Sequence, residues 1–324
     1  MVHAVRIHEP GGPEVLRWDE VEVPEPGAGE VRLRQTAIGL NYIDTYHRSG
    51  LYKLPSLPAT LGVEGAGVVE SVGAGVTTVR PGDRVAYGGA IGAYAETRLI
   101  AADRLIALPE WIDDVQAAGL MLQGMTAEFL LHRTYRVRPG DTILVQAAAG
   151  GVGLLLCQWA SRLGAVVIGT VSTEEKATLA RAHGCHHVIL YSRESFVERV
   201  RALTDGAGVP VVYDGVGQST FLGSLDCLRP RGLMVSFGQA SGPIPPFDIT
   251  VLSAKGSLYL TRPSLFAYVA KREELVASAG AVFEAVHTGA LTVEVRQTYP
   301  LKEAAAAHQA LEARATTGAT VLIP

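Results

Sequence analysis

Residues Asp141 to Lys176 read DTILVQAAAGGVGLLLCQWASRLGAVVIGTVSTEEK. The run from Thr142 to Gln146 is short, apolar and β-branched, as a buried strand is. Small residues fill 147–153, a helical pattern follows from Leu154 to Gly164, and the apolar run Ala165 to Val171 is again strand-like. This order predicts a βαβ unit, and a right-handed crossover would make its two strands parallel.

The small-residue segment AAAGGVG at 147–153 suits a nucleotide phosphate. Gly150 would let the backbone approach a pyrophosphate, and Gly153 would let the helix pack closely on the strand. The first N–H groups of that helix and the positive end of its dipole attract an anion. Ala148 stands at the first glycine position of the G-x-G-x-x-G pattern, so the match is partial, and a purely structural turn is the alternative. Because strand, helix and second strand flank it correctly, we expect dinucleotide binding.

The end of the second strand distinguishes NADP from NAD. An acidic residue here would bind the ribose 2′-OH of NAD. The segment Thr170 to Thr173 stands there instead, followed by Lys176, and hydroxyls with a cation suit a 2′-phosphate. Glu174 and Glu175 fall in the first turn of the next helix, where carboxylates are favourable anyway. We therefore predict NADPH as cofactor, with a merely solvated Lys176 as the alternative.

Composition narrows the class of protein. The chain has 324 residues, a net charge of −4, 48% hydrophobic and 19% charged residues, which indicates about two globular domains. The acidic balance gives no reason to expect nucleic acid or an anionic membrane as a partner. We predict a cytoplasmic protein, because the three cysteines are widely separated, the start of the sequence has no signal-peptide pattern, and no apolar run reaches membrane-spanning length.

The first part of the chain, residues 1–120, is predicted to be β-rich. Gly and Pro turns separate short apolar runs, which is typical of a small barrel. Strands are expected at 4–8, 31–38, 67–72, 84–87 and 93–100. The segment 39–61 is aromatic, polar and without periodicity, so we expect an irregular functional segment there. A helical pattern covers 116–135.

After Lys176, strands and helices alternate, which predicts a doubly wound parallel sheet of six strands. Further strands are expected at 188–191, 209–214, 232–238 and 256–260, with helices at 177–183, 194–203 and 219–228. The remainder, 263–324, has two helical segments and strands at 292–298 and 320–323, and is expected to return to the first domain.

Ten stretches of the sequence carry a resemblance to a known family. They are GGPEVL (11–16), IGLNYIDTYHRSGLY (38–52), LGVEGAG (61–67), VGAGV (72–76), PGDRV (81–85), AAAGGVG (147–153), VVYDGVG (211–217), RGLMVSFG (231–238), GSLYLTRPSL (256–265) and RATTGATVLIP (314–324). Together they resemble the medium-chain dehydrogenase/reductase superfamily, and within it the zinc-independent, zeta-crystallin-like quinone oxidoreductases.

The resemblance implies an α/β protein with a GroES-like β-barrel catalytic domain and a Rossmann domain whose doubly wound parallel sheet has six strands. The catalytic domain would cover 1–120, the NADPH-binding domain 121–262, and the chain would return to the catalytic domain at 263–324. The reaction implied is the reduction of a quinone, or another conjugated carbonyl, by hydride from NADPH.

No metal is expected. Zinc-dependent members of the superfamily have a cysteine where this chain has Asn41 and a histidine where it has Val63. Asn41 is a poor zinc ligand and Val63 is none, and the four-cysteine structural lobe is missing. His47 alone is more simply a surface or hydrogen-bonded residue.

The resemblance also implies a set of cofactor contacts. Gly150 to Val152 would hold the pyrophosphate, and four residues would hold the 2′-phosphate: Ser172, Lys176, Tyr191 and Arg314. Alternatively, Tyr191 is only an aromatic residue at the end of a strand, and Arg314 is only a surface cation near a helix end. The full set is Asn41, Tyr42, Asp44, Tyr46, Thr126, Gly150, Gly151, Val152, Ser172, Lys176, Tyr191, Val216, Phe237, Gly238, Gln239, Leu260, Arg262, Ser264 and Arg314.

Three residues are the expected catalytic donors. Hydride transfer to a quinone makes an oxyanion that needs a hydrogen-bond donor and a proton, and Asn41, Tyr46 and Tyr52 are the candidates. Alternatively, Tyr52 only shapes the pocket and water supplies the proton. An enone or alkenal reductase is a second enzymatic hypothesis, and an NADPH-binding non-catalytic or RNA-binding protein is a third. The apolar strand at 256–260, expected at a sheet edge, predicts a homodimer.

Overall fold

The computed structural model describes residues 1–324, which divide into two compact units. Unit 1 comprises Met1–Met125, Val269–Val282 and Val293–Pro324, and unit 2 comprises Thr126–Tyr268 and Phe283–Thr292. Unit 1 is therefore built from the beginning and the end of the sequence. None of the helices is both long and apolar enough to cross a membrane.

Unit 1 is dominated by β-structure. A three-stranded sheet has the order β2-β1-β4, and a larger sheet has the order β15-β16-β3-β5-β6-β8 with β7 paired to β3. The strands are β1 (Val2–Ile7), β2 (Arg17–Val21), β3 (Glu30–Leu40), β4 (Ala59–Thr60), β5 (Glu64–Val72), β6 (Arg84–Gly88), β7 (Thr97–Ala101), β8 (Ile106–Ala107), β15 (Val295–Pro300) and β16 (Ala319–Ile323).

One apolar core holds these sheets together. Val5 and Ile7 of the small sheet are buried in the same cluster as Leu33 and Ile38 of the larger one. The segment that precedes β7 also contacts β1, where the Val5 N–H donates to the Tyr94 carbonyl at 2.7 Å. The barrel-like packing expected for the first part of the chain therefore rests on a shared core.

Helices complete unit 1. They are the 3-10 turns η1 (Pro13–Val15), η2 (Ala102–Arg104) and η4 (Leu301–Glu303), and the helices α1 (Tyr42–Arg48), α2 (Asp114–Ala118) and α11 (Ala304–Glu312). The helix α1 lies within 39–61, so the expectation of a wholly irregular segment there is wrong. Its N-terminus is stabilised by the Asp44 carboxylate, which accepts from the Asn41 N–H at 2.9 Å.

The helical pattern at 116–135 is divided rather than continuous. The helix α2 ends before Gly119, α3 runs from Met121 to Phe129, and a π-helical turn covers Leu130–Thr134. The division between the units falls inside α3. The helix α10 (Arg272–His287) also spans the division.

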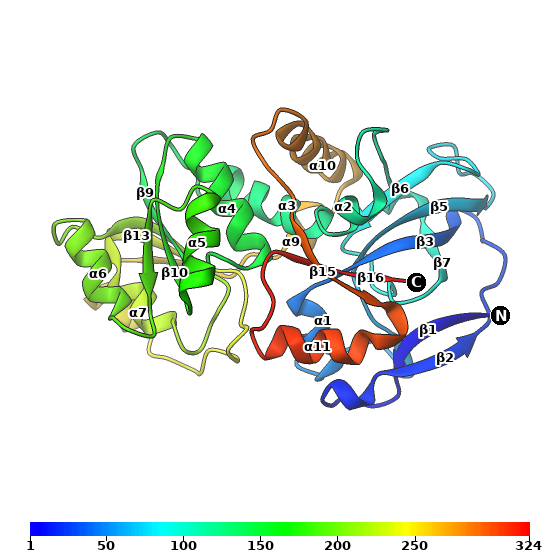
Figure 1. The fold of residues 1–324 in the computed structure, drawn as a ribbon, viewed down its shortest axis with the longest axis horizontal. Coiled ribbons are helices and arrows are strands. Elements are labelled where there is room, and N and C mark those ends of the chain that lie inside the picture. Colours follow the sequence, from blue (N-terminus) through cyan, green and yellow to red (C-terminus); the bar gives the residue numbers. More distant parts are fainter. The chain divides into compact units, whose positions relative to one another are not determined.

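Unit 2 contains a six-stranded parallel sheet, with the order β11-β10-β9-β12-β13-β14, so the expected Rossmann-type sheet is confirmed. Its elements, green to yellow in Figure 1, are β9 (Thr142–Val145), α4 (Gly151–Arg162), β10 (Val166–Val171), α5 (Glu174–Ala182), β11 (His187–Leu190), α6 (Phe196–Leu203), β12 (Val209–Asp214), α7 (Phe221–Asp226), β13 (Leu228–Ser236), α8 (Thr250–Ala254), β14 (Tyr259–Thr261) and α9 (Leu265–Tyr268).

The strand order reverses next to β9. From β9 the chain proceeds outward to β10 and β11, and then returns to place β12, β13 and β14 on the other side. Right-handed crossovers in opposite directions place helices on both faces of the sheet. Ligands of such sheets bind outside the carboxyl ends of the strands at the point of reversal, which here is between β9 and β12.

Candidate functional site

Most of the expected cofactor residues of unit 2 lie at the carboxyl ends of its parallel strands. Because parallel strands all end at the same edge, residues distant in sequence meet there. Gly150 to Val152 follow β9, Ser172 follows β10, Tyr191 follows β11, Val216 follows β12, Phe237 to Gln239 follow β13, and Arg262 and Ser264 follow β14. We call this edge the carboxyl edge. Leu260 lies within β14, and Thr126 lies on α3 and is buried.

The glycine turn after β9 has the close packing that a phosphate cradle requires. Gly150 caps α4 with extended backbone, φ −77° and ψ 170°. A Cβ on Gly153 would lie 2.3 Å from the Ala147 carbonyl oxygen, so only glycine lets α4 begin this close to the strand. The tight turn itself falls on Ala147, whose φ is +54°. The first N–H groups of α4 have no intrahelical partner, which fits the pyrophosphate of a dinucleotide.

At the end of β10, small hydroxyls and a lysine stand in place of an acid. Thr173 caps α5, and its side chain accepts from the Lys176 N–H at 3.3 Å. The carboxylate of Glu174 is engaged by Arg193 at 2.6 Å. Lys176 is half-buried beside the strand end. These residues suit a 2′-phosphate, which an uncompensated carboxylate would repel.

A buried aspartate that the sequence interpretation missed organises the middle of the carboxyl edge. Asp214 ends β12 and is fully buried. Its Oδ1 accepts from the N–H groups of Val216 and Gly217 at 2.8 and 3.0 Å. Its Oδ2 accepts from the hydroxyls of Thr220 and Ser224 at 2.7 and 2.8 Å. Asp214 thereby fixes the loop that carries Val216. The signal was a lone acid closing the apolar strand VVYD.

The loops after β13 and β14 are held against their neighbours by close backbone contacts. A Cβ on Gly238 would lie 2.5 Å from the Gly215 carbonyl oxygen, so the loop after β13 packs directly on the loop after β12. Arg262 is exposed and donates to the Ser236 carbonyl at 2.8 Å. Phe237 and Gln239 are half-buried and Ser264 is exposed.

In unit 1 the expected catalytic residues lie on α1 and on either side of it, with Asn41 as its N-cap. Tyr46 is buried, and its ring packs edge-on against Tyr52 at 5.2 Å between centroids. Tyr42 lies 6.1 Å from Tyr46 in the same measure. Tyr52 is half-buried, with its N–H bound to the Tyr46 carbonyl at 3.0 Å. Arg314 is exposed and electrostatically close to the Tyr42 hydroxyl.

Asn41 is fixed by two side chains that the sequence interpretation did not single out. Its Nδ2 donates to Glu64 Oε2 at 2.7 Å, and its Oδ1 accepts from Gln123 Nε2 at 3.2 Å. Glu64 Oε1 accepts from the Leu122 N–H at 2.6 Å. Glu64 is fully buried, and a Cβ on Gly39 would lie 2.3 Å from its Oε2. A lone glutamate inside the apolar run LGVEGAGVV was the available signal.

Asp44 ends a directed chain of hydrogen bonds that reaches α11. Arg48 donates to Nδ1 of His308 at 3.0 Å, so the proton of this imidazole lies on Nε2. That N–H donates to the Tyr94 oxygen at 3.0 Å, and the Tyr94 hydroxyl donates to Asp44 Oδ2 at 3.0 Å. Arg48 also holds Glu312 through two hydrogen bonds of 3.0 and 2.7 Å. We call these five residues the α1 relay.

Burial shifts the ionisation of these groups. Desolvation raises the pKa of Asp44 to about 7, against hydrogen bonds from Asn41 and Tyr94 that lower it. Desolvation likewise raises the pKa of Glu64 to about 8. Desolvation, aided by the Arg48 charge, lowers the pKa of His308 to about 3. His308 is therefore neutral at physiological pH, as its two hydrogen bonds require.

The structure contains no group of three or more His, Cys, Asp or Glu residues placed to hold a metal ion. At one of the two positions where zinc-dependent members of the superfamily have ligands, Asn41 bonds to Glu64. At the other, Val63 is 1% exposed and belongs to the core. Position 41 is therefore a hydrogen-bonded amide, and position 63 is an apolar core residue.

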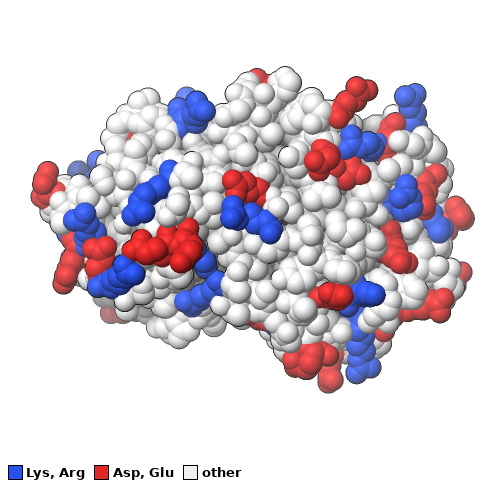
Figure 2. All heavy atoms as spheres, in the orientation of Figure 1, with Lys and Arg blue, Asp and Glu red and all other residues white.

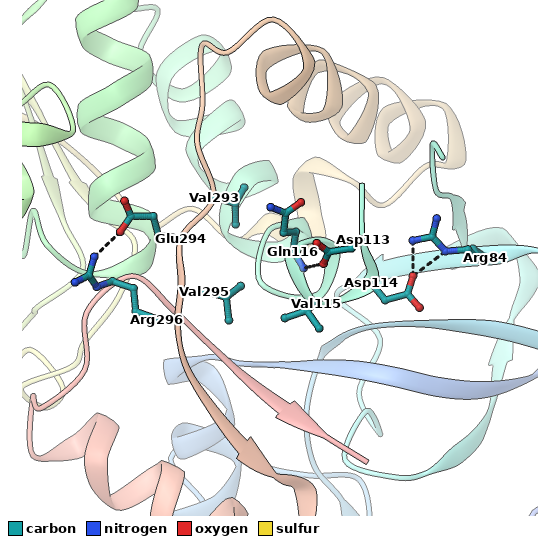
Figure 3. Close-up of a pocket in the computed structure, with 9 residues that line it drawn as sticks. All are labelled: Arg84, Asp113, Asp114, Val115, Gln116, Val293, Glu294, Val295 and Arg296. Atoms are coloured by element: carbon teal, nitrogen blue, oxygen red, sulfur yellow. Dashed lines mark hydrogen bonds and ion pairs between the residues drawn. The ribbon is translucent and has the colours of Figure 1, made fainter. Parts of the chain in front are cut away.

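A separate depression of about 900 Å³ lies on unit 1, and none of the expected site residues line it. Figure 3 shows two ion pairs among its lining side chains, Arg84 with Asp114 at 2.6 Å and Arg296 with Glu294 at 2.5 Å, while Asp113 accepts from the Gln116 N–H at 2.8 Å. Four of its charged side chains are therefore compensated within the depression. On the face drawn in Figure 2, acidic and basic side chains are intermixed.

Two family models match the chain. One, described as alcohol dehydrogenase GroES-like domain, matches residues 27–110, and the other, described as zinc-binding dehydrogenase, matches residues 151–275. The first falls in unit 1, and the second covers β10 to β14 of unit 2.

Curated relatives match over the full length. A quinone oxidoreductase of Pseudomonas aeruginosa is 53% identical over 325 residues, which cover 100% of both chains. A 2-haloacrylate reductase of a Burkholderia species is 50% identical over 331 residues, covering 100% of this chain and 99% of the relative. The crystal structure of Escherichia coli quinone oxidoreductase complexed with NADPH matches with a TM-score of 0.98 at 48% identity, covering 99% of this chain and 100% of that chain.

These matches confirm the resemblance inferred from the motifs. The chain belongs to the quinone oxidoreductases of the medium-chain dehydrogenase/reductase superfamily.

Proposed function

We propose that this protein reduces quinones with NADPH, by hydride transfer from the nicotinamide and without a metal. The observation that carries the proposal is the full-length likeness to a quinone oxidoreductase complexed with NADPH. We assign the catalytic domain to 1–120 with 263–324, and the NADPH-binding domain to 121–262.

The carboxyl edge would hold the cofactor. Gly150 to Val152 present the start of α4 to the pyrophosphate, and Ser172 with Lys176 meet the 2′-phosphate. Asp214 keeps the loop of Val216 in place through two N–H bonds. When bound, NADPH supplies the hydride, while the protein's part is to bind and orient it.

Residues of the α1 region would serve the acceptor. A quinone is flat, largely apolar and carries two carbonyl oxygens, so aromatic walls with a few donors suit it. Tyr46 and Tyr52 supply both ring surface and hydroxyl groups. Asn41 supplies an N–H held in one orientation. These groups would stabilise the negative charge that develops on the quinone oxygen.

The test is steady-state oxidation of NADPH with a panel of quinones. We expect turnover with simple quinones and much weaker turnover with NADH. A protein that binds NADPH but oxidises it with no acceptor on the panel would contradict the proposal and favour a non-catalytic role.

A second candidate reaction is reduction of a conjugated carbon–carbon double bond. The observation that favours it is the 50% identity to a 2-haloacrylate reductase over the whole chain. Including enones, alkenals and 2-haloacrylates in the same panel distinguishes the two. Quinones should give the higher kcat/KM.

We further propose a homodimer joined through β14, which lies at the edge of the sheet. Tyr259 on this strand is 62% exposed, and an apolar, unpaired edge favours pairing with a second copy. Three free cysteines, at 157, 185 and 227, also suit a reducing compartment such as the cytoplasm. A monomer in sedimentation at micromolar concentration would argue against the dimer.

A further inference from the structure

Glu64 is a buried carboxylate for which the proposed reaction as described so far has no use. Its side chain accepts from Asn41 and from the Leu122 N–H, and it lies fully buried at the start of β5. A buried acid without a partner of opposite charge is costly. The presence of an acid at this position therefore indicates a task that a neutral apolar residue could not perform.

Both oxygens of Glu64 act as acceptors in the structure. Oε1 faces the backbone N–H of Leu122, whose direction cannot be reversed, and Oε2 faces Asn41 Nδ2. On the other side of Asn41, Gln123 Nε2 donates to Oδ1. The Asn41 carboxamide is thus held between an acceptor and a donor, which permits one orientation. Its second Nδ2 hydrogen makes no hydrogen bond within the protein.

We propose that Glu64 is a positioning residue that holds Asn41 with Nδ2 as the donor end of its side chain, available to the oxygen of the bound acceptor. The inference rests on the proposed function, because it assigns Asn41 as a donor to the reducing acceptor. The role requires the ionised form of Glu64, and because burial raises its pKa to about 8 it is tested above that pH. The space for it is created by Gly39, since a Cβ there would collide with both Glu64 Oε2 and the Ala118 carbonyl.

The hydrogen-bond pattern predicts how substitutions of Glu64 and Asn41 change the orientation of the side chain at position 41. In Glu64→Gln, one end of the new amide must face the Leu122 N–H as acceptor, so its NH₂ group faces Asn41. Asn41 must then turn Oδ1 toward position 64, and the donor end is lost from its place. The double variant Asn41→Asp/Glu64→Gln restores an acceptor for every donor and keeps the net charge of the pair. It does not restore an N–H donor at position 41.

The experiment compares native protein, Glu64→Gln, Asn41→Asp/Glu64→Gln and the control Glu70→Gln, an exposed residue of the same strand. Melting temperature, NADPH dissociation constant and quinone kcat and KM are measured above the pKa of Glu64. We expect Glu64→Gln to lower kcat by at least about tenfold, the lower end of what loss of an oxyanion donor costs, with NADPH affinity nearly unchanged. The double variant should regain the melting temperature but not kcat, and Glu70→Gln should behave as native.

Every other result overturns the inference. Full kcat in Glu64→Gln means that Asn41 needs no carboxylate. Recovery of kcat together with melting temperature in the double variant means that Glu64 is only structural. A double variant that does not fold contradicts the hydrogen-bond pattern. If the native protein oxidises NADPH with no acceptor, the proposed function fails instead, so the two failures are distinguishable.

Discussion

Arg48 donates a hydrogen bond to Nδ1 of His308 at 3.0 Å, and this contact fixes the tautomer of a fully buried imidazole. The proton must lie on Nε2, which directs the bonds through Tyr94 to Asp44. Protonating His308 would place a second donor opposite the Arg48 guanidinium. The α1 relay is therefore stable only while His308 is neutral.

A pH dependence of stability follows. The pKa of His308 is lowered from 6.5 to about 3 by burial and by Arg48. A lowered pKa in the folded state gives stability that is present above the unfolded value and lost as pH falls toward the folded one. Glutamine can accept from Arg48 and donate to Tyr94 without titrating. We expect the melting temperature of the native protein to fall relative to His308→Gln as pH decreases from 6.5 to about 3.

The comparison between the two proteins is necessary because Asp44 titrates in the opposite sense. Its pKa is raised to about 7, so its contribution favours the folded state at low pH and is lost as pH rises. That contribution is common to both proteins and cancels in the difference. Parallel melting curves for native protein and His308→Gln over the whole range would contradict the assignment of His308 as neutral.

The proposed contact of Lys176 with the 2′-phosphate predicts a cofactor preference. Replacing Lys176 with alanine should weaken NADPH binding by about 1.5–3 kcal/mol, the usual contribution of a charged hydrogen bond, and should leave NADH binding almost unchanged. Fluorescence titration of both nucleotides measures this. Arg181→Ala, in the last turn of the same helix, is the control and should change neither affinity. Equal native affinities for NADPH and NADH would refute the 2′-phosphate assignment.

Tyr52 tests the acceptor site. Tyr52→Phe keeps the edge contact with Tyr46 but removes the hydroxyl. If that hydroxyl donates to the developing oxyanion, turnover should fall by about 10²–10³, with NADPH binding intact and a smaller loss for quinones that are already strong acceptors. Tyr52→Ala should also raise KM because it removes the aromatic wall. Full quinone turnover in both variants would mean that Tyr52 has neither role.

The glycine turn gives a matched pair of substitutions. Gly153→Ala places a methyl group 2.3 Å from the Ala147 carbonyl oxygen. It should cost about 1–3 kcal/mol of stability, as overpacking does, and should weaken NADPH binding by displacing the start of α4. Gly280→Ala, within α10, meets nothing within 4 Å and should instead gain about 0.5–1 kcal/mol. Thermal unfolding measures both, and an unperturbed Gly153→Ala protein would contradict the described packing.

Metal independence is the remaining prediction. Position 41 is a hydrogen-bonded amide and position 63 a core valine, so we expect dialysed protein to contain less than stoichiometric zinc and to keep full activity in a chelator. Elemental analysis that finds one tightly held zinc per chain, with activity lost on its removal, would reverse this conclusion.

The sequence predicts best what is fully buried. The strand Val209–Asp214 was expected with the bounds that β12 has, because all six residues are buried and form one uninterrupted pattern. The strand β2, Arg17–Val21, was not predicted. It is largely exposed at the edge of its sheet, so no alternation marks it. The helix α1 has seven residues, and its polar N-terminal contacts leave little periodicity to detect.

The site residues likewise fall into those that could be predicted from the sequence and those that could not. The glycine turn after β9 and the residues at the end of β10 could be proposed from the sequence pattern itself, and the other residues of the carboxyl edge from the family resemblance. Glu64 and His308 could not, since their roles depend on partners supplied by the fold. Tyr94 and His308 are 214 positions apart, and no local spacing relates them.

The pairing of β16 with β3 has a consequence for biosynthesis. Thr320, Val321 and Leu322 pair with Leu40, Gly39 and Ile38. One edge of this segment of β3 therefore stays unpaired until nearly the whole chain has been synthesised. Asn41 directly follows this segment of β3. All six strands of the unit 2 sheet are synthesised well before β16. The sheet of unit 2 can therefore form while the edge of β3 that leads into α1 still lacks its last partner strand.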